Sequence, residues 1–522
     1  MVTADAALGP SGTRLGDAIL VDGGRVAAVG SAEVLATRAD RIDRHPGAVI
    51  VPGLRDAHLH PIGHAASLHR PSLKDAASLA EIADVLGEAA ARQPADTAVV
   101  GMRLDDESLA EGRLPDRHLL DGVAGDRPVV AVRYCGHVSV ANTAALEIAG
   151  IGPDTPDPPG GTIDRDDGGR PTGVLRETAA EMVSTAVRSL APPVTASHLV
   201  DASMGLASLG LTGLGAMVAT SPGCWAGAMS ELDALLEAAP DLPLDTAVFV
   251  ITDTPGGLEE ARSRIDAAGG RLRFGGWKAF SDGSLGGHTA AMHEPFTDRD
   301  TTGTDRLDPA WALEMARTAL RLDGRVAIHA IGDRANGRVL DLMERLLAEG
   351  ADPARLRIEH ASVLTETDIR RFGRLGITAV VQPAFLVSEA DWLGRRLGSQ
   401  RLGRTYAFRS LLDAGTPLAG SSDSPVEPPH PLWGMAAARD RAGVVPREGL
   451  TADEALTMFT AGSAAAIGSE AGLRPGDAAD LTVLSADPLT TDPAGLRAAV
   501  ARAVYVGGDA VDVPAHTTAW VA

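Results

Sequence analysis

Short apolar segments alternate with amphipathic segments of helical period through the middle of this chain, and this alternation restricts the possible fold most. The apolar run 324–333, for example, precedes a segment that places Val339, Leu342 and Leu346 on one helical face. Repeated strand–helix units predict a parallel sheet, because a helical crossover returns the chain to the same edge of the sheet. Eight such strands are expected, at residues 51–60, 210–217, 246–251, 273–283, 324–333, 356–362, 377–383 and 416–425. Eight strand–helix units close an α/β fold, the (β/α)₈ barrel of the TIM type.

The two ends of the chain show a different pattern, in which short strands are separated by glycine and aspartate. Residues 16–30 contain two apolar runs on either side of Asp22-Gly23-Gly24, which is a hairpin signal. Similar runs occupy the C-terminal end. We therefore expect one small β-sandwich domain formed by both termini, residues 1–51 and 466–522, beside a barrel domain over residues 52–465.

A long stretch separates the first expected barrel strand from the second, at about residues 67–200. It includes a segment rich in proline, glycine and aspartate at residues 152–171. Long loops without structure of their own are uncommon in compact domains. We therefore expect an inserted subdomain after the first barrel strand, placed as a lid over the mouth of the barrel.

The composition describes a globular protein and narrows its partners. Of the 522 residues, 45% are hydrophobic and 22% are charged, and the formal net charge is −22. An acidic chain of this kind repels phosphate backbones and anionic membranes, so neither nucleic acid nor a membrane is an expected partner. The N-terminus lacks the pattern of a signal peptide, and no apolar stretch reaches the roughly 18 residues of a membrane helix. We expect a cytoplasmic protein whose partner is a small-molecule substrate, with a homodimer as an open possibility.

The two cysteines, Cys135 and Cys224, lie far apart and outside any C-x-x-C pattern. A disulfide framework or a thiolate zinc site is therefore not expected.

Two histidines end the first expected barrel strand. His58 and His60 are separated by one residue in the run DAHLH, so on a strand their side chains point the same way. Both imidazoles would then face the barrel interior at the carboxyl end of the strand, where barrel active sites form. Two converging imidazoles supply half of a zinc site. Taken alone, the pattern fits an incidental pair of histidines equally well.

Three further polar residues end other apolar strands. His329 ends VAIH, His360 ends RIEH and Asp423 follows PLAGSS. A single histidine on a strand is more often a core residue than a metal ligand. Several ionisable groups buried near one axis are costly unless something binds them, so the five residues together predict a metal centre.

Lys278, in the run GWKAF, lies on the fourth expected strand. A lysine in a barrel strand is normally paired or extends its amine to solvent. Beside divalent cations a free ammonium would be repelled. Lys278 therefore either lies at a distance from the cations or is carbamylated, which would give a carboxylate able to bridge two metal ions.

Six motifs together resemble the amidohydrolase superfamily, and within it the family-3 branch that includes N-substituted formamide deformylases. The resemblance covers nearly the whole chain. The motifs are PGLRDAHLH (52–60), GHVSVANTAAL (136–146), GGTIDRDDGGRPTGVLRE (160–177), KAFSDGSLGGHTA (278–290), HAIGD (329–333) and SDSP (422–425).

The resemblance implies roles for the matching residues. It makes His58 and His60 ligands from the first strand, His329 and His360 ligands from the fifth and sixth, and Asp423 the carboxylate that handles the proton. Lys278 becomes the candidate bridging carbamate on the fourth strand.

The resemblance also implies roles outside the ligand set. His137 and Glu177, in the insertion, are placed near the pocket, and Glu177 could be a ligand if Lys278 is unmodified. Glu177, Asp282 and His288 are expected to contact the substrate. Two positions depart from the family pattern, since Arg55 stands where an apolar residue is usual and His288 stands where arginine is usual. The second departure puts the transfer of a substrate from relatives in doubt.

The expected activity is hydrolysis of a C–N bond in a small amide or formamide. A bound Zn²⁺ would lower the pKa of water from about 15.7 towards 7, and Mn or Fe would suit the same ligands, as one ion or two. Asp423 would take the proton of water and deliver it to the leaving amine. His137 either donates a hydrogen bond to the developing oxyanion or makes a structural contact within the lid, and Gly283 and Gly286 suit a tight loop near the substrate.

Other activities stay open on the same scaffold. The order of motifs also fits deamination of a heterocycle or hydrolysis of a cyclic amide. A barrel without activity, used as an interaction module, is disfavoured because every expected type of metal ligand is present.

Overall fold

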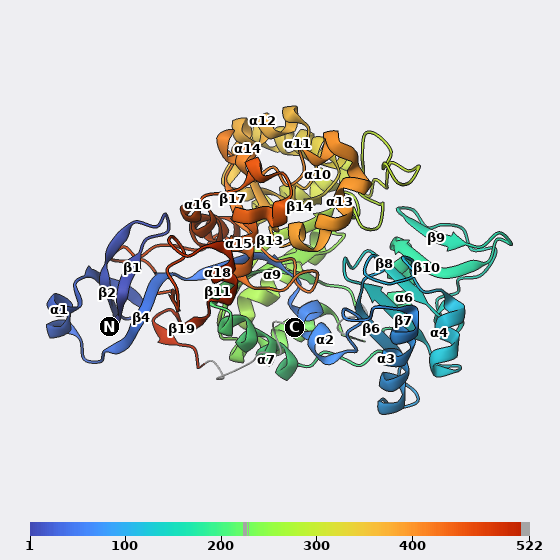
Figure 1. The fold of residues 1–522 in the computed structure, drawn as a ribbon, viewed down its shortest axis with the longest axis horizontal. Helices are drawn as coiled ribbons and strands as arrows, with labels where there is room; N and C mark the ends of the chain where they lie inside the picture. The colour runs from blue at the N-terminus through green and yellow to red at the C-terminus, as the bar shows by residue number, and fades with distance from the viewer. Residues whose placement is uncertain (223–226, 228, 513–522) are drawn as a thin grey trace.

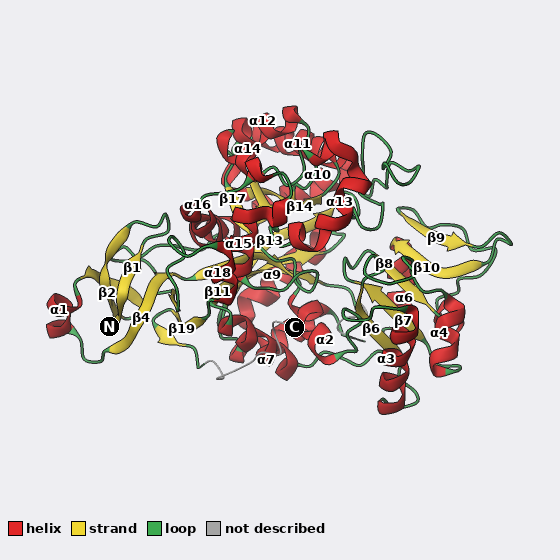
Figure 2. Cartoon of the chain, in the orientation of Figure 1, coloured by secondary structure: helices red, strands yellow, loops and turns green. Residues whose placement is uncertain are grey.

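The computed structural model describes residues 1–222, 227 and 229–512 and contains the predicted barrel. Eight parallel strands follow one another around a single sheet, in chain order (Figures 1 and 2). Each of the eight predicted segments overlaps one of them. The strands are β5 (Leu54–Leu59), β11 (Leu211–Ala219), β12 (Asp245–Ile251), β13 (Leu272–Phe280), β14 (Arg325–Ala330), β15 (Leu356–His360), β16 (Thr378–Val381) and β17 (Leu418–Gly420).

The first and last barrel strands meet through the chain that follows them. No ladder joins β17 to β5 in the described sheet, whose order runs from one to the other. Instead the backbone N–H of Asp423 donates to the carbonyl of His58, and that of His60 donates to the carbonyl of Ser424, both at 2.8 Å. The nearly closed barrel is therefore completed at the carboxyl ends of its strands, beside the predicted metal ligands.

Helices pack around the barrel as the alternation predicts. In α11 (Asp333–Ala348), the face with Val339, Leu342 and Leu346 is buried. The helix α10 (Pro309–Arg321) begins where Asp308 accepts a hydrogen bond from the backbone N–H of Trp311 at 2.8 Å. Further helices on the outside of the barrel are α7 (Ala196–Ser208), α8 (Glu231–Ala238), α9 (Pro255–Ala268), α12 (Glu366–Leu375) and α15 (Pro431–Asp440).

Both termini contribute to one further domain, at the left of Figure 1, as predicted. Its seven strands are hydrogen-bonded in a single mixed sheet in the order β20-β19-β18-β4-β1-β2-β3. The predicted hairpin joins β2 to β3, with Gly23 and Gly24 at φ 54° and 78° in the turn. The predicted domain boundaries stay a prediction, and residues 513–522 and Cys224 lie outside the described residues. The strands are β1 (Val2–Leu8), β2 (Arg14–Asp22), β3 (Arg25–Gly30), β4 (Asp43–Pro52), β18 (Leu481–Leu484), β19 (Ala501–Val506) and β20 (Asp509–Ala510).

The insertion after β5 has its own five-stranded sheet, at the right of Figure 1, in the order β6-β7-β8-β10-β9. Helices on both sides give it two apolar clusters of its own, and we call this insertion the lid. Its elements are β6 (Val99–Leu104), β7 (Val129–Arg133), β8 (Val138–Ala141), β9 (Gly161–Arg165), β10 (Pro171–Glu177), α3 (Leu79–Arg92), α4 (Arg117–Ala124), α5 (Thr143–Ile148) and α6 (Thr178–Val187).

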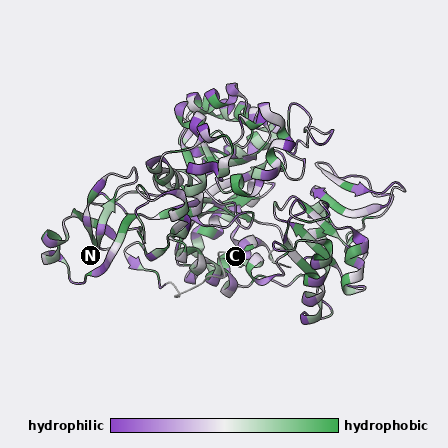
Figure 3. Ribbon diagram, viewed as in Figure 1, coloured by the Kyte–Doolittle hydropathy of each residue, from purple (hydrophilic) through white to green (hydrophobic). Residues whose placement is uncertain are grey.

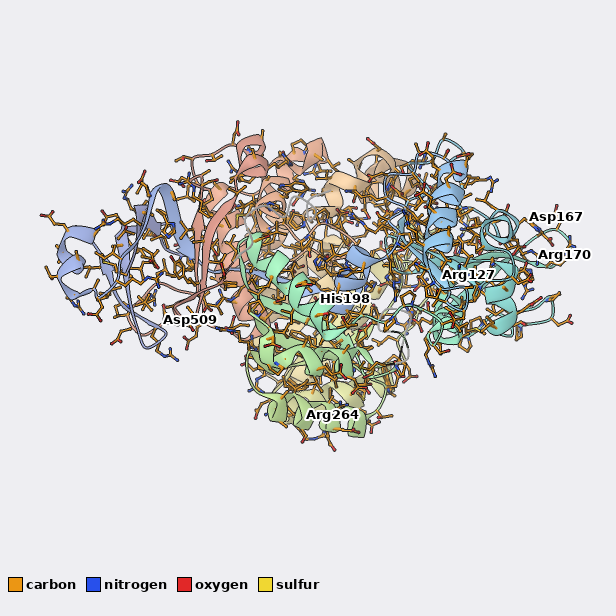
Figure 4. The ribbon with its side chains drawn as sticks, turned by 90° about the horizontal axis from the view of Figure 1, so that it is seen from below. Arg127, Asp167, Arg170, His198, Arg264 and Asp509 are labelled. Atoms are coloured by element: carbon orange, nitrogen blue, oxygen red, sulfur yellow. The ribbon has the colours of Figure 1, made fainter. Side chains whose placement is uncertain are left out.

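Apolar residues fill the interior, and charged side chains mark the ends of the molecule. Figure 3 shows hydrophobic segments concentrated in the central strands. In Figure 4, Asp167 and Arg170 lie at the far end of the lid, and Asp509 lies on the opposite side, at the terminal sheet. Within the described residues, no helix combines the length and apolar character needed to cross a membrane.

Candidate metal centre

His58, His60 and Asp423 converge at the carboxyl end of the barrel. The Nε2 atoms of His58 and His60 lie 3.2 Å and 3.4 Å from Oδ1 of Asp423. One potential ligand atom from each residue lies within 4.8 Å of the other two. Among the described residues, no other group of three or more His, Cys, Asp or Glu side chains has this spacing.

His329 and His360 extend this group along the ends of β14 and β15. The ring centroids of His329 and His360 lie 4.5 Å apart, and those of His360 and His58 lie 5.2 Å apart. The row continues from His58 to His60, whose centroids are separated by 5.6 Å. The structure therefore brings together all four predicted imidazoles, from three strands, together with the carboxylate of Asp423.

Hydrogen bonds behind the rings of His58 and His329 fix which ring nitrogen remains free. Nδ1 of His58 is bonded to Oε2 of Glu359, and Nε2 of His329 lies 3.0 Å from the carbonyl oxygen of Gly283. Both partners accept hydrogen bonds, so in the neutral ring these nitrogens carry the proton and donate it. The free lone pairs are then on Nε2 of His58 and Nδ1 of His329.

A chain of three hydrogen bonds orients His360. Its Nδ1 lies 2.8 Å from Oε1 of Gln382, whose Nε2 donates to Oγ of Ser421 at 2.8 Å. That hydroxyl donates in turn to the carbonyl of Val381 at 3.1 Å. The hydroxyl of Ser421 donates its one proton to this carbonyl, so it accepts a hydrogen bond from the side-chain amide of Gln382. The amide oxygen of Gln382 therefore faces His360. His360 donates from Nδ1 and keeps its lone pair on Nε2.

Glu359 is a site residue that the sequence analysis missed. It is 0% exposed and accepts hydrogen bonds from Nε and Nη2 of Arg357 at 2.6 Å and 2.7 Å, besides its bond to His58. Burial alone would raise the pKa of Glu359, but Arg357 and His58 hold it well below its usual range. The signal available in the sequence was an arginine and a glutamate two residues apart inside an apolar strand. A carboxylate behind a histidine ligand orients the ring and strengthens it as a donor.

Asp56 joins the ends of β5 and β17. Its Oδ1 accepts the backbone N–H groups of His58 and Ser422, both at 3.1 Å, and its Oδ2 accepts the hydroxyl of Ser422 at 2.5 Å. Burial raises the pKa of Asp56 to about 6, against the opposing effect of these hydrogen bonds. This carboxyl fixes the spacing between the strand that carries His58 and the loop that carries Asp423.

Lys278 lies on β13 and is 1% exposed. Its Nζ has no hydrogen-bond partner among the described residues and lies 4.2 Å from the ring centroid of Phe280. Burial lowers the pKa of Lys278 to about 8, although Glu359 and Asp423 oppose this shift. The amine is thus buried beside the histidine row, against the ring of Phe280 and without a hydrogen bond to the described residues.

The residues present fit a divalent cation. His58 carries its proton on Nδ1, so the lone pair on Nε2 is free. Oδ1 of Asp423 lies 3.2 Å from this Nε2, which makes no hydrogen bond to the described residues. A lone pair and a carboxylate oxygen repel each other unless a proton or a cation lies between them. Burial alone would lower the pKa of His58, but Asp423 and Glu359 raise it, so the field at this point favours positive charge. Imidazole and carboxylate donors suit zinc, manganese and iron.

The lid contributes His137 and Glu177. Nδ1 of His137 lies 2.9 Å from Oε2 of Glu177, which also accepts from Nη1 of Arg306 at 2.9 Å. Burial alone would lower the pKa of His137, but Glu177 raises it to about 9. Burial would likewise raise the pKa of Glu177, which His137 and Arg306 lower to about 2. His137 is therefore charged, and its ring centroid lies 5.3 Å from that of His329, whereas Glu177 is held by two cationic partners.

Asp282 and His288 lie in the loop after β13, but neither is among the described residues that line the main cavity. Asp282 is fully buried and accepts three backbone N–H groups at 2.8–3.0 Å, so it shapes the loop. Nε2 of His288 lies 3.0 Å from Oδ1 of Asp298. Oδ1 of Asp282 also lies 3.3 Å from Nε2 of His329, so Asp282 borders the predicted metal ligands, whereas His288 is paired with Asp298.

The glycines of this loop allow it to approach the lid. A Cβ atom on Gly283 would lie 2.2 Å from Oε1 of Glu177, and one on Gly286 would lie 2.4 Å from Nη1 of Arg133. Both distances are too short for non-bonded atoms, so a side chain at Gly283 would displace Glu177 and Thr289, and one at Gly286 would displace the guanidinium of Arg133.

A cavity of about 400 Å³ lies between the barrel mouth and the lid. Four of its lining residues are non-glycine residues with positive φ, a conformation that costs about 1–3 kcal/mol and clusters at functional sites. These are Arg103 (63°), Glu177 (54°), His360 (72°) and Asp423 (58°). The predicted residues that line the cavity are His58, His60, His137, Glu177, Lys278, His329, His360 and Asp423.

Solved structures share this fold. An uncharacterized metal-dependent hydrolase from Pyrococcus horikoshii superimposes with a TM-score of 0.74 at 27% identity, over 95% of this chain and 98% of that one. The atrazine chlorohydrolase TrzN from Arthrobacter aurescens, in complex with zinc, gives a TM-score of 0.54 at 18% identity, over 98% and 95% of the two chains. The second likeness concerns the fold alone.

Sequence comparison gives the family. The model of the amidohydrolase family matches residues 46–512. The protein YtcJ of Bacillus subtilis is 32% identical over 516 residues, which cover 95% of this chain and 96% of that protein. The N-substituted formamide deformylase of Arthrobacter pascens is 31% identical over 525 residues, 94% of each chain. The chain belongs to the amidohydrolase family, in its family-3 branch.

Proposed function

We propose that this amidohydrolase is a metal-dependent enzyme that cleaves a C–N bond in a small amide or N-substituted formamide. The observation that carries the proposal is the convergence of His58, His60 and Asp423, with ligand atoms within 4.8 Å of one another, on the wall of the cavity. The full-length relative that is an N-substituted formamide deformylase supports the choice of bond.

The proposed cation is Zn²⁺, with Mn²⁺ and Fe²⁺ as alternatives. Its ligands would be His58, His60, His329 and His360, with Asp423 at its side. When bound, a divalent cation lowers the pKa of water and polarises the substrate carbonyl. The protein supplies the rest of the chemistry through its own side chains.

Asp423 is the proposed proton carrier. Burial alone would raise its pKa, but His58 and His60 hold the pKa of Asp423 well below its usual range, so the carboxylate is ionised at neutral pH. It takes a proton from the attacking water as the bond from oxygen to the carbonyl carbon forms. It then gives that proton to the leaving nitrogen as the C–N bond breaks.

His137 is the proposed oxyanion donor. Glu177 accepts the hydrogen bond from Nδ1, which leaves the N–H at Nε2 for the cavity. Removal of one such donor costs about 2.7–4 kcal/mol of transition-state stabilisation in well-studied enzymes. A role confined to the lid is the alternative, and it predicts that substitution of His137 lowers stability without a matching loss of kcat.

Lys278 is the proposed site of carbamylation. Its Nζ has no hydrogen-bond partner among the described residues, and carbamylation would convert it into a carboxylate able to bridge two cations. An unmodified amine predicts a single cation. Mass spectrometry of the intact protein under CO₂, together with metal analysis, distinguishes the two states.

A substrate panel tests the proposal. The metal-loaded protein is offered N-formyl amines, N-acyl amino acids, cyclic amides and aminated heterocycles, and released amine, formate and ammonia are measured separately. The proposal predicts amine release from at least one N-formyl or N-acyl compound. Release of ammonia from heterocycles alone, or opening of cyclic amides alone, would replace it with deamination or cyclic-amide hydrolysis.

A further inference from the structure

The lid presents two arginines to the cavity from neighbouring strands. β6 and β7 pair in parallel, with Leu104 opposite Arg133, so Arg103 and Arg133 come at the carboxyl ends of the two strands. Both residues line the same cavity as the proposed metal ligands. Neither has a role in the chemistry proposed for the metal centre.

The guanidinium of Arg133 interacts with the thiol of Cys135, but two of its nitrogens lack an oxygen acceptor among the described residues. The residue is 2% exposed, and its Nε lies 2.6 Å from Oδ1 of Asp106. Its guanidinium lies over the ring of Tyr134, 4.4 Å from the centroid, and its Nη1 and Nη2 have no hydrogen-bond partner among the described residues. Buried donors of a charged group without acceptors are costly, so a bound ligand is the expected source of acceptors.

Arg103 is the second arginine of this pair, and Glu427 and Asp75 act on it through their charges without an ion pair among the described residues. Its Nε is buried without a hydrogen bond, and it forms no ion pair with any described residue. Burial lowers the pKa of Arg103, and the charges of Glu427 and Asp75 raise it. Its backbone is held at φ 63°, a conformation that is rare for arginine. Asp106 thus forms an ion pair with Arg133, whereas the structure shows no ion pair to Arg103 within the described part of the chain, so Arg103 can bind an anionic group of a ligand.

We propose that Arg103 and Arg133 bind a carboxylate of the substrate, which makes N-acylated or N-formylated amino acids the preferred substrates over neutral amides. This inference rests on the proposed C–N hydrolysis and names its substrate class. The planar fork of a guanidinium matches a carboxylate with two parallel hydrogen bonds. A carboxylate adds one negative charge to a cavity that Glu177, Glu181 and Asp423 already line, whereas a phosphate group would add about −1.5 to −2 at neutral pH.

A matched pair of substrates tests the inference. N-formylphenylalanine and N-formylphenethylamine differ only in the carboxylate, and kcat and KM are measured for both with the metal-loaded protein. Arg103→Gln is expected to raise KM for the acid by about 10- to 100-fold, with kcat within about twofold, because the lost contact acts equally in ground and transition states. The neutral compound should be unaffected. Equal effects on both compounds would overturn the inference.

Two further variants guard against loss of the fold and against general charge effects. Arg133→Lys keeps a cation beside Asp106 but loses the planar fork of the guanidinium. It should therefore also raise KM for the acid and not for the neutral compound. Arg41→Gln removes the same charge at a side chain that is 80% exposed, and it should leave kcat and KM unchanged for both substrates. If Arg41→Gln raised KM for the acid as much as Arg103→Gln, the cause would be long-range electrostatics, and the inference would be wrong.

If neither compound is hydrolysed, that result counts against the proposed reaction. The carboxylate site is then tested by measuring binding directly. Calorimetric titration then compares 3-phenylpropionate with 3-phenylpropanamide on the wild type and on Arg103→Gln. The inference predicts tighter binding of the acid to the wild type, by at least tenfold, and loss of that preference in the variant. Equal binding of acid and amide to the wild type would contradict it.

Discussion

Oε1 of Gln382 lies 2.8 Å from Nδ1 of His360 and determines which nitrogen of that ring is free. Gln382→Leu removes the acceptor and lets the ring change tautomer or turn. We expect metal affinity to fall by about 10- to 100-fold, as for other residues that orient metal ligands, with little change in fold. Gln382→Glu, which keeps an acceptor, should retain most of the affinity. Competition with a chromogenic chelator measures both, and equal affinities in wild type and Gln382→Leu would contradict this role.

Glu359 and Arg357 form a buried ion pair behind His58. Glu359→Gln removes one charge and leaves Arg357 without its counter-ion in the interior. Breaking such a pair destabilises proteins by about 3–5 kcal/mol, and we expect a loss of that size in chemical denaturation. Glu349→Gln breaks the exposed pair between Glu349 and Arg317 and should cost at most about 1 kcal/mol. A loss no larger for Glu359→Gln than for this control would show that the pair is not a structural element.

Glu231 gives the stability a predictable dependence on pH. Burial raises its pKa to about 7, while a hydrogen bond from the backbone N–H of Ala219 opposes the shift. The folded chain then holds a proton that the unfolded chain releases above the ordinary pKa of about 4.3. The contribution of Glu231 is therefore complete below that pH and is lost as the pH rises to about 7. Glu231→Gln should flatten this part of the stability profile, and Glu237→Gln, an exposed change on the same helix, should not.

Gly283 permits the contact between its loop and the lid. A Cβ atom there would lie 2.2 Å from Oε1 of Glu177 and 2.3 Å from Oγ1 of Thr289. We expect Gly283→Ala to destabilise the protein by about 1–3 kcal/mol, the usual effect of overpacking, and to lower kcat by displacing Glu177 and His137. Gly87→Ala, in α3 with no atom near the added methyl, should instead stabilise by about 0.5–1 kcal/mol. Thermal unfolding and steady-state kinetics of the two variants test this contrast.

Local patterns in the sequence were sufficient to predict the barrel and the positions of the histidine row. His58, His60, His329 and His360 each come at or directly after the end of an apolar run, and the parallel topology brings strand ends to one edge. Asp423 follows the same logic in the loop after β17.

Contacts between distant segments could not be predicted in this way. Glu359 meets His58 across 301 residues, and Gln382 meets His360 from the next strand. The sequence likewise does not show that Asp282 accepts three backbone N–H groups beside His329, and its predicted contact with the substrate stays a prediction. The free donors of Arg103 and Arg133 depend on how the lid folds against the barrel, and no periodic pattern records this.

The central claim is that separate strands bring imidazoles and a carboxylate around a catalytic cation. The most direct measurement is elemental analysis with parallel kinetics on the wild type and on the double variant His58→Ala, His60→Ala. The account predicts at least one divalent ion per wild-type chain, and in the variant a loss of both bound metal and turnover with the fold retained. A variant that kept its metal and its turnover would contradict the account.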